Sequence, residues 1–259
     1  MFQIFYPTIY QPLYNALVWL YNVIPGQDFG IAIIVITLFL KAILIPVSKK
    51  QIESQKKLQE LQPKIKEIQT KYKNDKEKQS KELMNFYKEN KANPFSGCLP
   101  MIVQLIFLIA IYRVFFNISS NNLNVQGDIL YSFVSNPGQI NNMFLHIIDL
   151  AKPSIPLAIL AAISQYFQTK MLMAKQKNKA PKASKDGKGP DFTQIMNKQM
   201  LYLGPLLTLF IGIKFPAGLA LYWLVSTLFA VGQQMYIEDG FQSLKKYIPG
   251  RKISKVVEK

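Results

Sequence analysis

A lysine inside an apolar stretch is the residue whose position most strongly suggests chemistry. Lys41 is the only charged residue between Phe29 and Val47. It lies 12 residues after Phe29, which is about 18 Å along a helix. A lysine at such a depth in a membrane costs ~2.5–3.5 kcal/mol on insertion scales, so it usually faces a water-filled cavity or an anionic partner. The other interpretation is that its ammonium group snorkels to the lipid headgroups.

Uncharged polar residues on the other apolar stretches would complete a hydrated groove around this cation. Thr37, Lys41 and Ser48 are spaced by four and seven residues and are expected on one helical face. The whole candidate substrate-binding set is Lys41, Thr37, Ser48, Gln104, Ser164, Gln165, Gln168, Tyr222, Trp223, Ser226 and Gln233. Each uncharged member could instead form a helix–helix hydrogen bond, worth about 0.6 kcal/mol on average.

Catalytic and metal chemistry are not expected. The chain has no G-x-S-x-G, Walker A or H-E-x-x-H motif, and its apolar stretches carry no Asp or Glu. With one His and one Cys, it offers neither a disulfide nor the usual ligands of a structural metal site. We therefore expect no catalytic residue, no metal and no cofactor. A groove without carboxylates is also poorly suited to proton-coupled transport.

The composition points to a membrane protein. The 259 residues are 49% hydrophobic and carry 31 Lys+Arg against 15 Asp+Glu, a net charge of +16. Long uncharged or nearly uncharged stretches separate the charges, at 29–47, 98–112, 153–169 and 199–237. Each is close to or above the length that crosses a hydrocarbon core of ~30 Å. This distribution excludes a soluble nucleic-acid-binding domain.

Five membrane-spanning helices are predicted, because the last apolar stretch is too long for one span. The sequence from Lys214 to Gly218 contains Pro216 and offers a turn that divides it. Residues 49–91, 170–198 and the tail from 238 hold 27 of the 31 Lys+Arg. The positive-inside rule then places the N-terminus outside and the C-terminus in the cytoplasm.

The predicted fold class is an all-α membrane protein with a cytoplasmic helical hairpin between the first and second spans. Its segments are an extracytoplasmic interfacial helix in 1–28, the first span at 29–48, the hairpin at 49–92, the second span at 93–116, an extracytoplasmic loop at 117–152, the third span at 153–173, a flexible basic cytoplasmic loop at 174–198, the fourth and fifth spans with a short outer turn at 199–237, and a basic cytoplasmic tail at 238–259.

Two of these segments have alternative interpretations. The start of the chain is rich in aromatics and has no basic n-region, which argues against a signal peptide and for a surface helix from Pro12 to Val23. A disordered tail is the alternative. The hairpin carries an apolar stripe with spacings of three and four, from Leu58 to Tyr72. It could also be a solvated linker whose charges serve topology alone.

Five distinctive stretches carry a family resemblance. They are QPLYNALVWLYNVIP (11–25), IIVITLFLKAILIPVSKKQ (33–51), LQPKIKEIQTKY (61–72), NPFSGCLPMIVQLIFLIAIYRVF (93–115) and FPAGLALYWLVSTLFAVGQQ (215–234). Their sequence and order resemble the YidC/Oxa/Alb membrane protein insertase family, in its short bacterial form without a large extracytoplasmic domain.

The resemblance implies a non-enzymatic insertase and chaperone for nascent membrane proteins. In the family, five helices enclose a hydrophilic groove that is open to the cytoplasm and lipid and closed on the outer side. A basic residue of the first span lies in that groove, and Lys41 stands at the matching position. The family typically has Arg there, so Lys41 keeps the charge and loses the planar guanidinium fork.

The resemblance also implies partners and a location. The partners are nascent membrane proteins, the lipid bilayer and the ribosome, with no small-molecule substrate; whether the Sec translocon takes part stays open. A bacterial plasma (inner) membrane is the expected location, favoured by the lack of a transit peptide, with the chain crossing it several times. Two other functions stay open: a small channel or transporter, and an assembly chaperone without insertase activity.

Overall fold

The computed structural model describes residues 5–93, 99–177 and 192–237. The predicted basic tail and most of the predicted basic loop at 174–198 lie outside these residues. In chain order, the elements are η1 Tyr6–Tyr10, α2 Gln11–Val23, α3 Phe29–Ile43, α4 Ile45–Lys71, α5 Lys76–Glu89, α6 Leu99–Ser120, η3 Gly127–Ile129, β1 Met143–Phe144, β2 Ile148–Asp149, α7 Ile155–Lys177, α8 Phe192–Lys214 and α9 Ala217–Ile237. Within these described ranges, the regular structure is helical apart from one short antiparallel strand pair, β1–β2.

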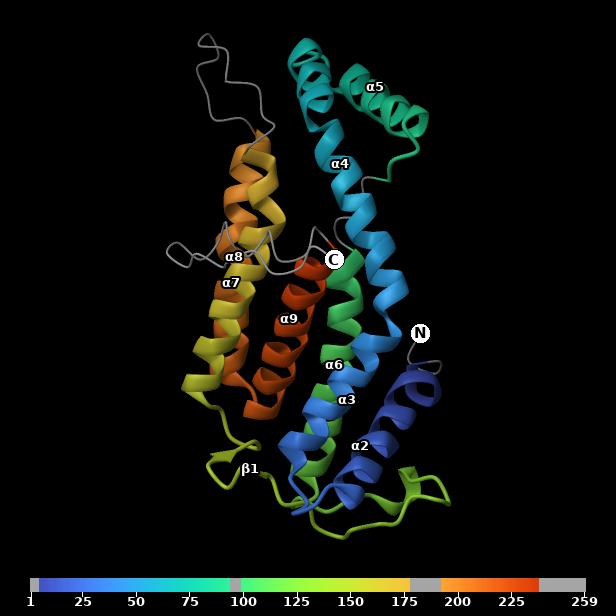
Figure 1. The fold of residues 1–259 in the computed structure, drawn as a ribbon, viewed down its shortest axis with the longest axis vertical. Helices are drawn as coiled ribbons and strands as arrows, with labels where there is room; N and C mark the ends of the chain where they lie inside the picture. Colours follow the sequence, from blue (N-terminus) through green and yellow to red (C-terminus); the bar gives the residue numbers. More distant parts are fainter. Residues whose placement is uncertain (1–4, 94–98, 178–191, 238–259) are drawn as a thin grey trace, which may run out of the picture.

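Helix α9 lies at the centre of a helical bundle (Figure 1). It packs against α3, α6, α7 and α8, and α7 packs along α8. Small residues let α7 and α8 approach closely, since a Cβ added to Gly212 would lie 2.7 Å from the Cβ of Ala158. The hairpin α4–α5 projects from one end of the bundle, and the loop between α6 and α7 covers the other (Figure 1).

The helix of the first predicted span is bent where a continuous helix over 29–48 was expected. α3 ends at Ile43, α4 begins at Ile45, and the two helix axes differ by 62°. Pro46 explains the break, because it has no N–H and its ring clashes with the carbonyl of the residue four positions earlier. Ser48 consequently lies on α4, beyond the bend, and the seven-residue spacing does not put it on the α3 face of Lys41.

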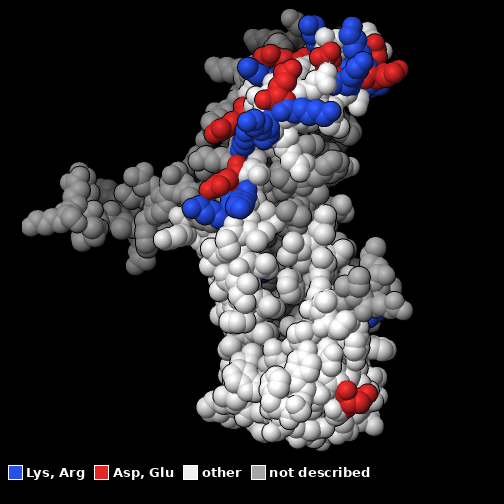
Figure 2. Space-filling view, turned by 90° about the vertical axis from the view of Figure 1, so that its right-hand side faces the viewer, with Lys and Arg blue, Asp and Glu red and all other residues white. Residues whose placement is uncertain are grey.

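The hairpin is joined by a capped turn. Asp75 accepts a hydrogen bond from the backbone N–H of Lys78 at 2.9 Å, the usual way to begin a helix such as α5. Gln79 donates across the turn to the carbonyl of Gln69 at 2.6 Å. Figure 2 shows the charged side chains of one face gathered over this hairpin, whereas the bundle below is nearly free of charge on that face.

Helix α2 is anchored in the core at the end of the bundle opposite the hairpin. Its Tyr14 and Tyr21 are buried, although their position near the start suggested a membrane interface. The hydroxyl oxygen of Tyr14 accepts from the backbone N–H of Gln126 at 3.0 Å, and that of Tyr21 accepts from Asn141 at 2.8 Å. Tyrosine is suited to such sites because its ring packs in the core while its hydroxyl finds a polar partner.

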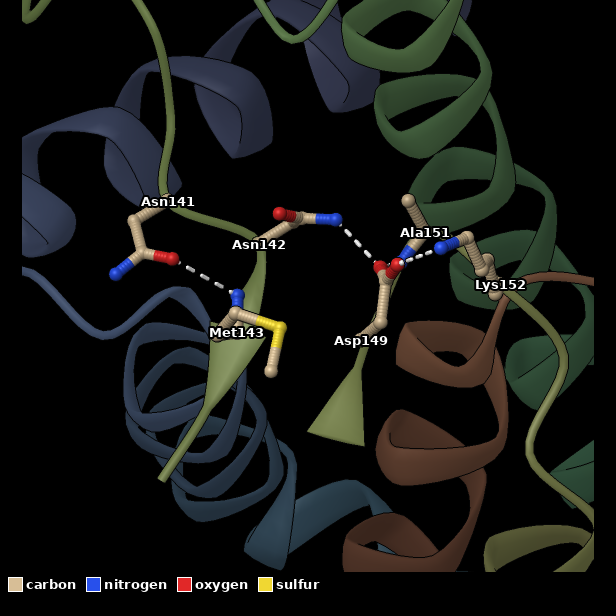
Figure 3. Close-up of polar contacts among 6 residues, drawn as sticks. All are labelled: Asn141, Asn142, Met143, Asp149, Ala151 and Lys152. Carbon is tan, nitrogen blue, oxygen red and sulfur yellow. Dashed lines mark hydrogen bonds and ion pairs between the residues drawn. The ribbon is translucent and has the colours of Figure 1, made fainter. Parts of the chain in front are cut away.

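The strand pair β1–β2 and the residues next to it link α3 and α9 at this end. Its Asp149 accepts hydrogen bonds from the Asn142 side chain and the Ala151 backbone, and forms an ion pair with Lys152 at 3.0 Å (Figure 3). The Lys152 carbonyl then accepts from the first N–H of α9, that of Ala217, at 2.8 Å. Asp28, the N-cap of α3, accepts from the N–H of Ile31 at 3.0 Å and from that of Leu145 at 2.6 Å.

Large apolar side chains are exposed along the bundle. On α7 and α8 they include Ile159, Ile163, Phe167, Leu203, Leu206 and Phe210. By length and hydropathy, one helix among the described residues, Ile102–Ser120, could cross a membrane, and the bent pair Phe29–Ile43 and Ile45–Gln55 would be a second if it forms one span. Leu201–Lys214 is a shorter apolar helix. The glutamines and serines of α7 and α9 lower the hydropathy of those helices.

Candidate functional site

The cation of α3 meets two polar side chains from two other helices. Lys41 Nζ lies 3.1 Å from Gln104 Oε1 on α6, and the Ser226 hydroxyl on α9 lies 2.7 Å from the same oxygen. We call Lys41, Gln104 and Ser226 the cation cluster. Lys41 and Gln104 are half-buried, and Ser226 is buried. This contact directs the Lys41 ammonium toward an amide between helices, which favours the polar site over snorkelling to the lipid headgroups.

A second polar contact joins α7 to α9. The indole N–H of Trp223 donates to Gln165 Oε1 at 3.0 Å, and the Thr227 hydroxyl lies 3.4 Å from that oxygen. We call Gln165, Trp223 and Thr227 the amide–indole cluster. Thr227 was not among the sequence candidates, although it follows Ser226 directly and stands one helical turn after Trp223.

Other candidates use their polar groups within their own helix. The Thr37 hydroxyl donates to the Ile33 carbonyl at 2.5 Å, and Ser164 donates to the Ala161 carbonyl at 2.8 Å. Both residues are buried, and such bonds to the preceding turn satisfy a hydroxyl without any partner from another helix. The structure therefore does not connect these two hydroxyls with the cation cluster.

The remaining candidates lie on α4, α7 and α9. Tyr222 is buried on α9, and Gln168 is half-buried on α7. Ser48 is half-buried on α4, beyond the bend. Gln233, near the end of α9, donates to the Ile45 carbonyl at 3.5 Å, so α9 also contacts the bend between α3 and α4.

The main electrostatic feature of the site is the positive charge of Lys41, whose hydrogen-bond partner is the uncharged side chain of Gln104. The partner of the Lys41 ammonium is an amide oxygen, which carries a partial charge only. Among the described residues, no three His, Cys, Asp or Glu side chains lie together as metal ligands would. The arrangement can attract an anion or a hydrogen-bond acceptor.

Comparison with known proteins gives the family. A family model described as 60Kd inner membrane protein matches residues 19–245. A Clostridium tetani protein named membrane protein insertase YidC is 36% identical over 209 residues, which are 81% of this chain and 81% of that protein. A Fusobacterium nucleatum protein of the same name is 32% identical over 231 residues, 88% of this chain and 96% of that protein.

Other relatives with this name are longer than the chain. It is 31% identical to the Pelobacter propionicus protein over 232 residues, and this match spans 39% of that protein's length. The match to the Streptomyces avermitilis protein spans 51%. The matched region includes the helices that carry both polar clusters. A helical membrane protein with this match belongs to the 60Kd inner membrane protein family, which is the YidC/Oxa/Alb family that its motifs resemble.

Proposed function

We propose that this chain inserts nascent membrane proteins into the lipid bilayer through a hydrophilic groove that is open to the cytoplasm and closed on the outer side. Relatives named membrane protein insertase support the activity. The observation that carries the mechanism is the position of Lys41, a cation between helices whose partner is a neutral amide. Its charge is therefore available to an incoming client.

The groove requires a topology, which is part of the proposal. Helices α3, α6, α7, α8 and α9 form five spans. The N-terminus lies outside and the C-terminus in the cytoplasm. The charged hairpin α4–α5 extends into the cytoplasm, where basic residues are favoured (Figure 2). The hydrogen-bonded loop 117–152 closes the outer end. These assignments are supported by the exposed apolar side chains along the bundle.

The free-energy argument needs no nucleotide hydrolysis. Transfer of a polar client flank through hydrocarbon is costly because its groups lose their hydrogen bonds to water. A hydrated, positively charged half-channel shortens that path and stabilises an acidic flank midway. The client's apolar segment then moves into lipid along α7 and α9, and this partitioning supplies the driving force. The membrane potential contributes about 2.3 kcal/mol per charge per 100 mV.

The partners and location follow from the same mechanism. Clients are nascent membrane proteins, so the ribosome is a partner on the cytoplasmic side, and the Sec translocon is a second candidate. The location is the bacterial plasma membrane. No small molecule, metal or cofactor takes part.

The test is insertion of one client by the purified chain. Vesicles with and without the chain receive a single-span client that has an acidic N-terminal flank, in the absence of nucleotide, and protection of the flank from protease is measured. The chain should increase protection. Lys41→Glu should abolish this increase for the acidic flank, because like charges repel, whereas Lys41→Arg should retain it.

The controls separate the competing functions. Normal insertion by Lys41→Glu at normal abundance contradicts the role of the charge. Flux of ions or small solutes through the vesicles without a client favours a channel or transporter. Binding of the client without protection of its flank favours an assembly chaperone.

A further inference from the structure

The amide of Gln104 is held in one orientation by its neighbours. Lys41 has three N–H donors and no acceptor, so the Gln104 atom that lies 3.1 Å from its Nζ is the oxygen. Ser226 donates to the same oxygen at 2.7 Å. Both bonds therefore fix Oε1 between α3 and α9, and the amide nitrogen Nε2 points away from these two groups.

The nitrogen of this amide is unsatisfied. Gln104 Nε2 is buried and has no hydrogen-bond partner among the described residues. An unpaired buried donor costs about 1–3 kcal/mol. The stability of α6 does not explain a glutamine at this place, because an apolar side chain would fill it without that cost.

We propose that Gln104 determines the specificity of this site for client carboxylates, an inference that rests on the proposed insertase function. Through Oε1, Gln104 holds the Lys41 ammonium between the helices. Through Nε2, it supplies a second donor to the carboxylate that Lys41 attracts. The ligand is an Asp or Glu side chain in the hydrophilic flank of a client.

The first part of this role follows from the flexibility of lysine. Its charge is carried on a four-carbon stem that can reach toward headgroups. Lys41 lies near the end of α3, just before the bend. The hydrogen bond with Gln104, itself braced by Ser226, keeps the ammonium inside the bundle.

The second part follows from the number of acceptors that a carboxylate offers. Its two oxygens have about four lone-pair sites, so one carboxylate can accept from both the ammonium and the amide. Hydrogen bonds to charged groups are shorter and stronger than neutral ones. A bound carboxylate also satisfies the buried Nε2, which removes the cost that this donor carries in the resting cluster.

The test is a double-mutant cycle with two matched clients. The clients differ only in whether the flank carries Asp or Asn, and insertion into vesicles is measured for wild type, Gln104→Leu, Lys41→Met and the double variant. Gln104→Leu should lower insertion of the Asp client by about fivefold, the equivalent of one hydrogen bond, and change the Asn client by less than about twofold. In the Lys41→Met background, Gln104→Leu should have no further effect, because Gln104 acts together with that cation.

Gln104→Glu is a second test, because this variant has nearly the shape of the wild-type side chain. It keeps an oxygen toward Lys41 and Ser226, replaces the amide donor by an acceptor, and cancels the positive charge. Insertion of the Asp client should fall further than with Gln104→Leu. The control is Thr208→Val on α8, which removes a buried hydroxyl that bonds to the Gly204 carbonyl of its own helix and is not part of the cation cluster. It should leave the ratio of the two clients unchanged.

The outcomes separate this inference from the proposed function. If the Gln104 variants lower insertion of both clients equally, Gln104 is a structural residue and the inference is overturned. The same holds if they lower insertion just as strongly in the Lys41→Met background. If the Asp client depends on Lys41 but not on Gln104, the inference fails and the insertase mechanism stands. If the wild-type chain inserts neither client, both fail.

Discussion

The two ends of the bundle use polar side chains in opposite ways. At the end of the bundle that the loop 117–152 covers, the key polar groups have several partners: Asp28 accepts two backbone hydrogen bonds, and Asp149 accepts two hydrogen bonds and also forms an ion pair. We call Asp28, Asp149 and their partners the loop-end network. In the cation cluster, Gln104 Oε1 accepts from two donors, whereas the Nε2 amide donor has no acceptor among the described residues. A fully satisfied network rigidifies a fold, whereas an unsatisfied one costs stability and is retained for another reason.

This difference divides structure from proposed function. Substitutions in the loop-end network should lower the free energy of unfolding and leave client discrimination unchanged. Substitutions in the cation cluster and the amide–indole cluster should lower client discrimination more than they lower the free energy of unfolding. The following predictions test this division, from the largest expected effect to the smallest.

The largest effect is expected at Gly218 of α9, which packs against Phe115 of α6. A Cβ there would lie 1.8 Å from Phe115 Cζ, and Phe115 is itself buried. Gly218→Ala should therefore destabilise the protein by about 3 kcal/mol through overpacking. The matched control is Gly232→Ala in the same helix, where a Cβ would meet nothing within 4 Å. It should be neutral or stabilise by up to about 1 kcal/mol. Thermal unfolding in detergent measures both, and equal midpoints would contradict the packing.

The second effect is expected at Asp28. Asp28→Ala removes the acceptor of two backbone N–H groups, those of Ile31 and Leu145, and should cost about 2 kcal/mol. Asp28→Asn keeps one acceptor oxygen, so its stability should lie between those of the wild type and Asp28→Ala. Hydrogen exchange of the Leu145 amide should accelerate in both variants. Unchanged exchange with lost stability would mean that the cap of α3 alone carries the effect.

The third effect belongs to the amide–indole cluster. Gln165→Leu removes the acceptor of the Trp223 indole and should cost about 1 kcal/mol of stability. Gln168→Leu, one turn along the same helix, is the control and should cost less. Gln165→Leu should also lower insertion of an acidic-flank client, and by more than the lower stability of the variant explains. A drop in abundance that accounts for the whole effect would assign Gln165 to structure.

Local patterns allowed much of the helical architecture to be predicted. Long uncharged stretches indicated the helices of the bundle, and the apolar stripe from Leu58 to Tyr72 indicated the first helix of the hairpin, α4. The break between α8 and α9 follows from Pro216. The bend at Leu44 was missed because hydropathy continues across it, although Pro46 was the available signal.

The partners of the polar residues could not be predicted, because they come from helices far apart in sequence. Lys41 and Gln104 are both conspicuous in apolar stretches, but only the packing of α3, α6 and α9 brings Lys41 and Ser226 to the side-chain oxygen of Gln104. The same residue types elsewhere bond to their own helix, as Thr37 does. The burial of Tyr14 and Tyr21 was missed for a related reason, since their donors belong to the loop more than 100 residues later.

The smallest effect is expected where the loop-end network reaches solvent, at Lys152. The Lys152 side chain is 80% exposed, and its ion pair with Asp149 is a surface pair, for which the typical contribution is at most about 1 kcal/mol. Lys152→Ala should change the stability by less than about 0.5 kcal/mol, because the Lys152 carbonyl that caps α9 is retained. Asp149→Ala should cost more, since it also leaves the Asn142 amide and the Ala151 N–H without their acceptor. Equal losses in denaturant unfolding would mean that the exposed charge, rather than the hydrogen bonds of Asp149, holds the strand pair against α9. In that case high salt should weaken the wild type to the level of Lys152→Ala, whereas the hydrogen-bonded network predicts little dependence on salt.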